Sequence, residues 1–141
     1  MTKKDIAHKY PWLEIDIDVE VGWFQLVSAL CGRLQWYCDQ HKIEYPKVRQ
    51  IKEKFGALCF YIDTDPYNKH MTYGLFSIIG DYEAMSRFVC EKCGTTVNVG
   101  WSTGWIKSIC ESCFNSHCLN TEWKSENKDL IDYNVDEIKF K

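Results

Sequence analysis

Four cysteines in the second half of the chain have the types and spacing of a metal site. They form two Cys-x-x-Cys pairs separated by sixteen residues, namely Cys90 with Cys93 and Cys110 with Cys113. Each pair can place two thiolates on one side of a cation, and two pairs supply the tetrahedron that structural Zn²⁺ prefers. Because four sulfur ligands leave no open coordination position, we expect the zinc to stabilise the fold rather than to catalyse a reaction.

Other cysteine chemistries fit the pattern less well. A redox site normally needs one Cys-x-x-Cys pair in a β-α-β setting, and disulfides are disfavoured in a reducing compartment. A zinc deaminase would require Pro before the second pair, where Ile109 stands, and a His-x-Glu sequence that the chain lacks. We interpret His117 and Cys118 as bystanders, and the remaining cysteines as packing residues: Cys31, Cys38 and Cys59.

The segment between the two pairs predicts a metal-supported hairpin. Its Thr, Val and Ile content and its length fit a zinc ribbon or a treble clef that turns near Gly100 or Gly104. Two interpretations of its tryptophans stay open, because a large aromatic on a pinned loop can anchor a partner or fold back onto the core. We expect at least one to be buried. The candidate partner-binding residues of this loop are Trp101, Ser102 and Trp105.

Composition indicates a folded protein with a small net charge. The 141 residues are 45% hydrophobic and 15% aromatic, which suits one packed domain, and the net charge is −3. No stretch reaches the roughly 18 apolar residues of a membrane span, and the first twelve residues lack a signal-peptide core. We therefore expect a cytoplasmic protein without a membrane partner.

Two charged stretches are candidate binding surfaces. In the acidic stretch 14–20, carboxylates alternate with apolar residues, so one strand face could meet a basic partner or simply protect a sheet edge. Its candidate residues are Asp16, Asp18 and Glu20. The basic band within 42–54 could instead bind nucleic acid, with Phe60 or Tyr61 for stacking, or form an ordinary solvated face. Its candidate residues are Lys47, Arg49, Lys52 and Lys54.

Hydrophobic periodicity predicts the elements that must hold these residues. Alternation over 14–21 predicts a strand, and a period near 3.6 predicts a helix from Trp23 to about His41. A hairpin around Lys54-Phe55-Gly56 follows, although its first arm also fits a helical stripe. A second helix is predicted over 71–89, with Leu75, Ile78, Ile79, Tyr82, Met85 and Val89 on one face. A short final strand is predicted at Ile131, Tyr133 and Val135.

Four stretches of the chain resemble a family of small, poorly characterised bacterial and phage proteins. They are "GWFQLVSALCGRL", "QIKEKFGALCFYID", and "YEAMSRFVCEKCG" followed by "GWIKSICESC". Family members often read "QIKEKFGxLRFY", so Cys59 stands here where an arginine is common. The resemblance covers about residues 22 to 113 and implies a phage setting and a C-terminal zinc knuckle.

Together these patterns predict one α+β domain, 1–141, in which two helices pack on a small antiparallel sheet. Its expected parts are an α+β core at 14–89, a zinc ribbon or treble-clef-like four-cysteine module at 90–118 and an extension at 119–141. Since no phosphate loop, Gly-x-Ser-x-Gly sequence or paired catalytic carboxylates are evident, we expect a non-enzymatic binding protein. We expect it to bind and inhibit a host protein such as a nuclease-based defence complex in the host cytoplasm. The alternative is a nucleic-acid-binding zinc-ribbon regulator.

Overall fold

A computed structural model describes residues 1–63, 69–117 and 121–125, and it confirms the α+β class. Short 3-10 turns occupy Pro11–Leu13 and Val21–Trp23. The helices are α1 (Lys3–Lys9), α2 (Phe24–His41), α3 (Lys69–Ser86) and α4 (Glu111–Ser116). The strands are β1 (Ile17–Asp18), β2 (Val48–Lys54), β3 (Ala57–Ile62), β4 (Val99–Ser102), β5 (Ser108–Cys110) and β6 (Trp123–Lys124).

The first sheet has the order β1-β2-β3 and is mixed. Strands β2 and β3 form the expected antiparallel hairpin, closed by the pair Lys54 and Ala57, so the helical alternative for β2 is wrong. Strand β1 pairs parallel to β2, which corrects the prediction of an antiparallel sheet. The reason is that α2 connects β1 to β2 and carries the chain back to the starting end of the sheet.

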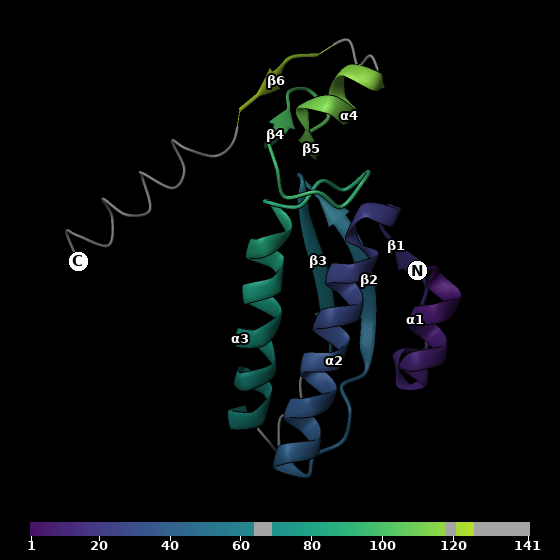
Figure 1. Ribbon diagram of the computed structural model, residues 1–141. Coiled ribbons are helices and arrows are strands. Elements are labelled where there is room, and N and C mark those ends of the chain that lie inside the picture. Colours follow the sequence, from purple (N-terminus) through teal and green to yellow (C-terminus); the bar gives the residue numbers. More distant parts are fainter. Residues whose placement is uncertain (64–68, 118–120, 126–141) are drawn as a thin grey trace, which may run out of the picture.

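Helices α2 and α3 lie side by side over one face of this sheet (Figure 1). The predicted apolar face of α2 is buried, and it includes Val27, Leu30 and Leu34. On α3 the prediction holds for Leu75 and Ile79 but fails for Met85, which is 43% exposed. Met85 falls on the outer side of the helix, because the inner side of the last turn faces β3 through Ser86.

Two local features differ from the sequence-based expectation. The strand expected over 14–21 is reduced to Ile17–Asp18, because the chain turns in a 3-10 helix at Val21–Trp23. Helix α1 was not anticipated, although Thr2 and Asp5 form a reciprocal capping box at its start. Ile6 of α1 is fully buried, so this helix belongs to the core.

The free edge of β3 is covered by side chains of α3. The Leu58 N–H donates to the Ser86 hydroxyl at 2.9 Å, and the Phe60 N–H donates to the Glu83 carboxylate at 2.9 Å. An exposed strand edge would offer its N–H groups to other chains. In this protein two of them are satisfied internally, and they fix the end of α3 from which the first cysteine pair follows.

A second sheet, ordered β5-β4-β6, forms a smaller unit with α4 at one end of the molecule (Figure 1). Its small core contains Val99 and Ile109, with Trp123 packed against them. Because β6 pairs with β4, this unit includes residues beyond the expected limit at 118. The predicted strand at 131–135 lies outside the described residues, as does Cys118. No helix in the described ranges is long and apolar enough to cross a membrane.

We predict that Ser86→Ala destabilises the protein by about 1–3 kcal/mol, because the buried Leu58 N–H would lose its acceptor. Urea unfolding measures this change. Ser77→Ala is the control, since Ser77 is an exposed residue of the same helix and should change stability by less than about 0.5 kcal/mol. Equal effects of the two substitutions would contradict the assignment.

Candidate metal centre

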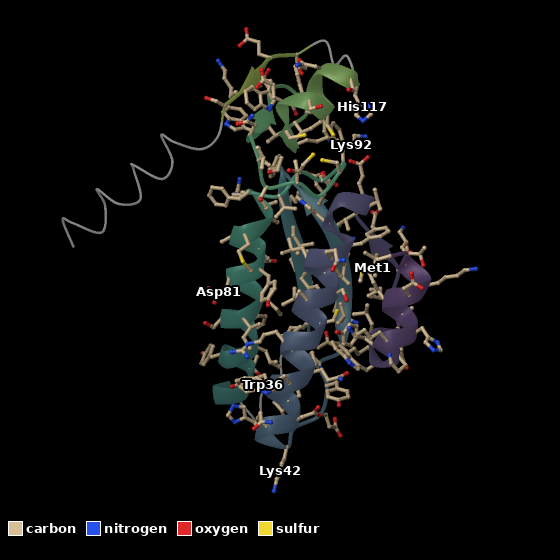
Figure 2. All side chains as sticks on the ribbon, in the orientation of Figure 1. Met1, Trp36, Lys42, Asp81, Lys92 and His117 are labelled. Carbon is tan, nitrogen blue, oxygen red and sulfur yellow. The ribbon has the colours of Figure 1, made fainter. Side chains whose placement is uncertain are left out.

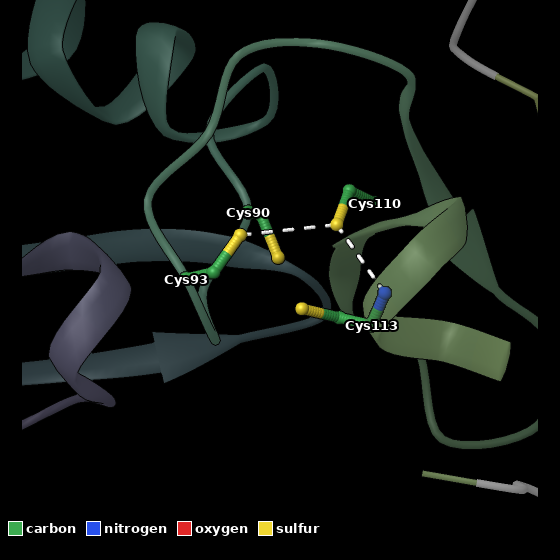
Figure 3. Close-up of side chains that lie close together, drawn as sticks. All are labelled: Cys90, Cys93, Cys110 and Cys113. Carbon is green, nitrogen blue, oxygen red and sulfur yellow. Dashed lines mark hydrogen bonds between the residues drawn. The ribbon is translucent and has the colours of Figure 1, made fainter. Parts of the chain in front are cut away.

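The four predicted cysteines converge on one point (Figure 3). One ligand atom from each of Cys90, Cys93, Cys110 and Cys113 lies within 4.8 Å of all the others. The Cys93 and Cys110 sulfurs are 3.8 Å apart. Metal–sulfur bonds of about 2.3 Å give a tetrahedron with edges of about 3.8 Å, whereas a disulfide needs about 2.05 Å. The spacing therefore fits a four-thiolate metal site rather than a pair of disulfides.

Backbone turns at both pairs aim the sulfurs inward. In the first pair the Gly94 N–H donates to the Cys90 carbonyl at 2.8 Å, and Gly94 has a positive φ of 83°, which glycine adopts readily. In the second pair Cys110 ends β5 and caps α4, so that the Cys113 N–H points at the Cys110 sulfur from 3.4 Å. Cys90 and Cys93 therefore lie in a tight turn, Cys110 lies at the end of β5, and Cys113 lies in the first turn of α4.

The electrostatics of the cluster are compatible with a bound cation. Burial opposes ionisation of Cys90, but hydrogen bonds from the backbone of Cys110, Cys93 and Lys92 outweigh it and lower the pKa of that thiol. Burial raises the pKa of both Cys110 and Cys113, and the Cys90 sulfur raises both further, although hydrogen bonds with Cys113 offset part of the rise at Cys110. Four adjacent thiolates would repel one another unless a bound cation compensated their charge.

The first cysteine turn is seated directly on Gly22, just before α2. The Gly22 N–H donates to the Glu91 carbonyl at 2.8 Å, and the Trp23 indole N–H donates to the Val89 carbonyl at 2.9 Å. A Cβ atom on Gly22 would lie 2.2 Å from the Cys90 carbonyl oxygen and 2.4 Å from that of Glu91. Only glycine allows this approach of two backbones. No local sequence pattern predicts this approach, because Gly22 and Cys90 lie far apart in the chain.

An ionic cluster ties the same turn to the N-terminal part of the chain. Glu20 accepts from Lys92 at 2.8 Å and from Lys107 at 3.2 Å. Burial alone would raise the pKa of Glu20, but the two lysines hold it below its usual value. Lys107 also lies 3.6 Å from the Glu91 carboxylate, which is 2% exposed and whose pKa is raised by burial. In Figure 2, Lys92 lies where the smaller unit meets α2.

A second junction joins the turns of the two hairpins. The Ser108 hydroxyl donates to the Gly56 carbonyl at 2.6 Å, and both groups are buried. Gly56 has a φ of 79°, and a Cβ atom placed on it would lie 3.2 Å from Ile106 and 3.3 Å from the Ser108 nitrogen. The β2–β3 turn therefore packs against the end of the β4–β5 loop. The sequence pattern did not predict this contact.

The candidate residues of the β4–β5 loop divide into three environments. Trp105 is 75% exposed, Trp101 is half-buried, and Ser102 is fully buried. The Ser102 hydroxyl donates to the Trp105 carbonyl at 2.7 Å and accepts from the Lys107 N–H at 3.0 Å. The proposal that Ser102 contacts a partner is therefore wrong, because its hydroxyl shapes the loop from inside. The loop turns at Gly104, with a φ of 75°, and not at Gly100.

The acidic stretch is only partly available to a partner. Asp16 and Asp18 are exposed, but Glu20 is occupied by the two lysines of the ionic cluster. Asp16 lies 3.7 Å from Lys3. Glu20 joins two parts of the fold, so Asp16 and Asp18 are the carboxylates of this stretch that remain most open to a partner.

The basic band is interrupted. Lys47, Arg49 and Lys54 are exposed and Lys52 is half-buried, but Arg49 is paired with Asp63 at 2.9 Å. Asp18 is the register partner of Lys52 across β1 and β2. The suggested stacking residue Phe60 is 2% exposed, whereas Tyr61 is 41% exposed.

The cysteines outside the cluster show two different environments. Cys31 and Cys38 are fully buried, and burial raises their pKa to about 12 and about 11. They are packing residues, as predicted. Cys59 is half-buried, so the prediction of a packing role fits it less well.

Comparison with protein-family models, with curated proteins and with solved structures found no match.

We predict that Gly22→Ala lowers the free energy of unfolding by at least about 1–3 kcal/mol, because its Cβ collides with two backbone carbonyls. Gly80→Ala is the matched control. Gly80 lies inside α3 and a Cβ there meets nothing within 4 Å, so the substitution should stabilise the protein by about 0.5–1 kcal/mol. Denaturant unfolding compares them, and a neutral Gly22→Ala would refute the close approach.

Proposed function

We propose that this chain is a non-enzymatic binding protein whose four-cysteine cluster holds a structural zinc ion. The donor set supports zinc, since four thiolates at tetrahedral spacing suit it better than the oxygen-preferring Mg²⁺ or Ca²⁺. Cys90, Cys93, Cys110 and Cys113 would hold the ion and close its coordination shell. Its chemistry is then to crosslink the chain, and metal affinity becomes folding free energy.

The order of elements around the cluster supports a treble-clef-like module. A tight turn supplies Cys90 and Cys93, the β4–β5 hairpin follows, and the start of α4 supplies the last ligand. Trp123 packs against the small core of the module, and its indole N–H donates to the Ile109 carbonyl at 2.9 Å. A unit this small buries little apolar surface, so a metal crosslink would contribute much of its stability.

The exposed Trp105 carries the proposal of a binding role. It is 75% exposed on a loop whose base is tied to the cluster through β5. Exposing a large aromatic side chain to water is unfavourable, and a rigid exposed aromatic is a common anchor in protein interfaces. We therefore expect a partner to contact Trp105.

A protein partner is favoured over nucleic acid. Phosphate binding requires several cations along one surface, whereas in the basic band Arg49 is paired with Asp63 and Asp18 lies beside Lys52. The net charge of −3 gives no general attraction to nucleic acid. The resemblance to bacterial and phage proteins supports a host protein as the partner, and we take inhibition of a nuclease-based defence complex as its specific form.

Elemental analysis tests the metal. Protein purified without chelator should contain about one zinc per chain, because one complete ligand set is present. Cys113→Ser should lose the metal and lower the melting temperature, whereas Cys59→Ser, outside the cluster, should keep both. A metal-free wild-type protein, or equal losses in the two variants, would reject the structural zinc.

Affinity capture and filter binding test the partner class. Tagged protein should retain a specific bacterial protein in quantitative mass spectrometry, and Trp105→Ala should lose it. Tyr73→Ala is the control, because Tyr73 is a 67% exposed aromatic on α3, away from the loop. Steep salt-dependent binding of oligonucleotides to filters, without a captured protein, would overturn the protein-binding proposal in favour of the nucleic-acid regulator.

A further inference from the structure

An apolar cleft lies between the turns of the two hairpins. It has a volume of ≈ 250 Å³ and is lined by Glu53, Lys54, Phe55, Gly104, Trp105 and Ile106. We propose that it is the docking site for an acidic segment of a partner protein that inserts an aliphatic or aromatic side chain between Phe55 and Trp105. This inference rests on the proposed binding function and specifies its site and the chemistry of its ligand.

Phe55 shows the first sign that the cleft is functional. The pair Lys54 and Ala57 closes a two-residue turn, in which Phe55 has a φ of 52° and Gly56 a φ of 79°. Such turns favour Asn or Asp before Gly, and a bulky residue with positive φ is strained. Phe55 is also 68% exposed, so it gains little from burial in return. Backbone strain that burial of the side chain does not offset is frequent at binding sites.

The two aromatic side chains are held as a pair by structure beneath them. The Ser108 hydroxyl binds the Gly56 carbonyl directly below the β2–β3 turn, and Ile106 packs against the same glycine. Ser102 binds the Trp105 carbonyl and the Lys107 N–H, which fixes the other turn. The cleft walls are therefore positioned before a partner arrives, which lowers the entropy cost of binding.

The charge at the rim selects an acidic partner. Lys54 is exposed, its ammonium lies 5.9 Å from the centre of the Phe55 ring, and it makes no ion pair within 1–63, 69–117 and 121–125. Glu53, which also lines the cleft, is half-buried and accepts from the Gly56 N–H at 2.7 Å, so its carboxylate is the less exposed of the two charges. The more exposed charge beside the aromatic walls is therefore the Lys54 ammonium, which complements a carboxylate.

A nucleobase stacked between the two rings would use the same walls. A bound strand, however, needs cations that continue away from the cleft, and the next lysine on the outer face, Lys52, has Asp18 as its register partner. One free lysine suits one carboxylate near an apolar side chain better than a chain of phosphates. The observations therefore favour an acidic protein segment.

Fluorescence anisotropy with labelled hexapeptides tests the site on the zinc-loaded full-length protein. The probes are an acidic peptide with a central Leu-Phe, its charge-inverted form with Lys and Arg, an acidic peptide with a central Ser-Ser, and a poly-dT oligonucleotide. We expect the acidic Leu-Phe peptide to bind at least about tenfold more tightly than the other three. Equal binding of the charge-inverted peptide, or tighter binding of the oligonucleotide, would overturn the proposal.

Phe55→Asn separates binding from folding. It places Asn-Gly in the turn, so the melting temperature should rise by about 3 °C, while affinity for the acidic Leu-Phe peptide falls by about 30-fold. Lys54→Gln should remove the preference for acidic over basic peptides and leave the fold unchanged. Tyr73→Ala should alter neither property.

The outcomes distinguish this site from the general function. If Phe55→Asn left peptide affinity unchanged, the cleft would be rejected, whether or not a bacterial protein is captured through Trp105. If no bacterial protein were captured but the acidic peptide bound in the cleft, the docking chemistry would stand and the proposed host target would fail. A loss of melting temperature in Phe55→Asn would refute the strained turn.

Discussion

The seating of the Cys90–Glu91 backbone on Gly22 is the constraint on which the rest of the structure depends. It brings two carbonyl groups to a distance that excludes even a Cβ atom, and it adds the Gly22 hydrogen bond to Glu91. The contact with Gly22, just before α2, thereby fixes the position of Cys90 and Cys93 relative to the large core. The four-cysteine cluster is consequently part of the fold's interior framework rather than a separate appendage.

Electrostatics reinforce the same junction. Glu91 is 2% exposed, and burying a carboxylate is costly unless an opposite charge compensates it. Lys107, from just before β5, lies between Glu91 and Glu20, and Lys92 binds Glu20 from the other side. This cluster adds little stability where it is exposed to water. Its buried part instead favours one relative placement of the cysteine turn and the hairpin.

Local patterns in the sequence were sufficient for the four-cysteine cluster and most elements, but not for the junctions between the two parts of the fold. The cysteine spacing, the α2 stripe and the β2–β3 hairpin follow from residues near one another in the chain. Over 14–21, alternation suggested a long strand, because periodicity does not reveal the turn at Val21 or a parallel partner. Gly22 and Ser108 contact segments more than fifty residues away, and no local pattern encodes such contacts.

The position of Phe55 shows how the two halves of the molecule combine. Its turn is fixed by the hairpin that packs under α3, whereas Trp105 is fixed by a loop that leads into the cysteine cluster. Without a metal, the smaller unit would keep its limited core around Val99 and Ile109 and its contacts with Gly22, Glu20 and Gly56, but it would lose the proposed crosslink among its four cysteines. The spacing of the two exposed rings would then rest mainly on the Ser108–Gly56 hydrogen bond and the Ile106 contact beneath the turns, because only one of the rings belongs to the large core. The cysteine cluster thus acts at a distance on a surface that contains none of its ligands.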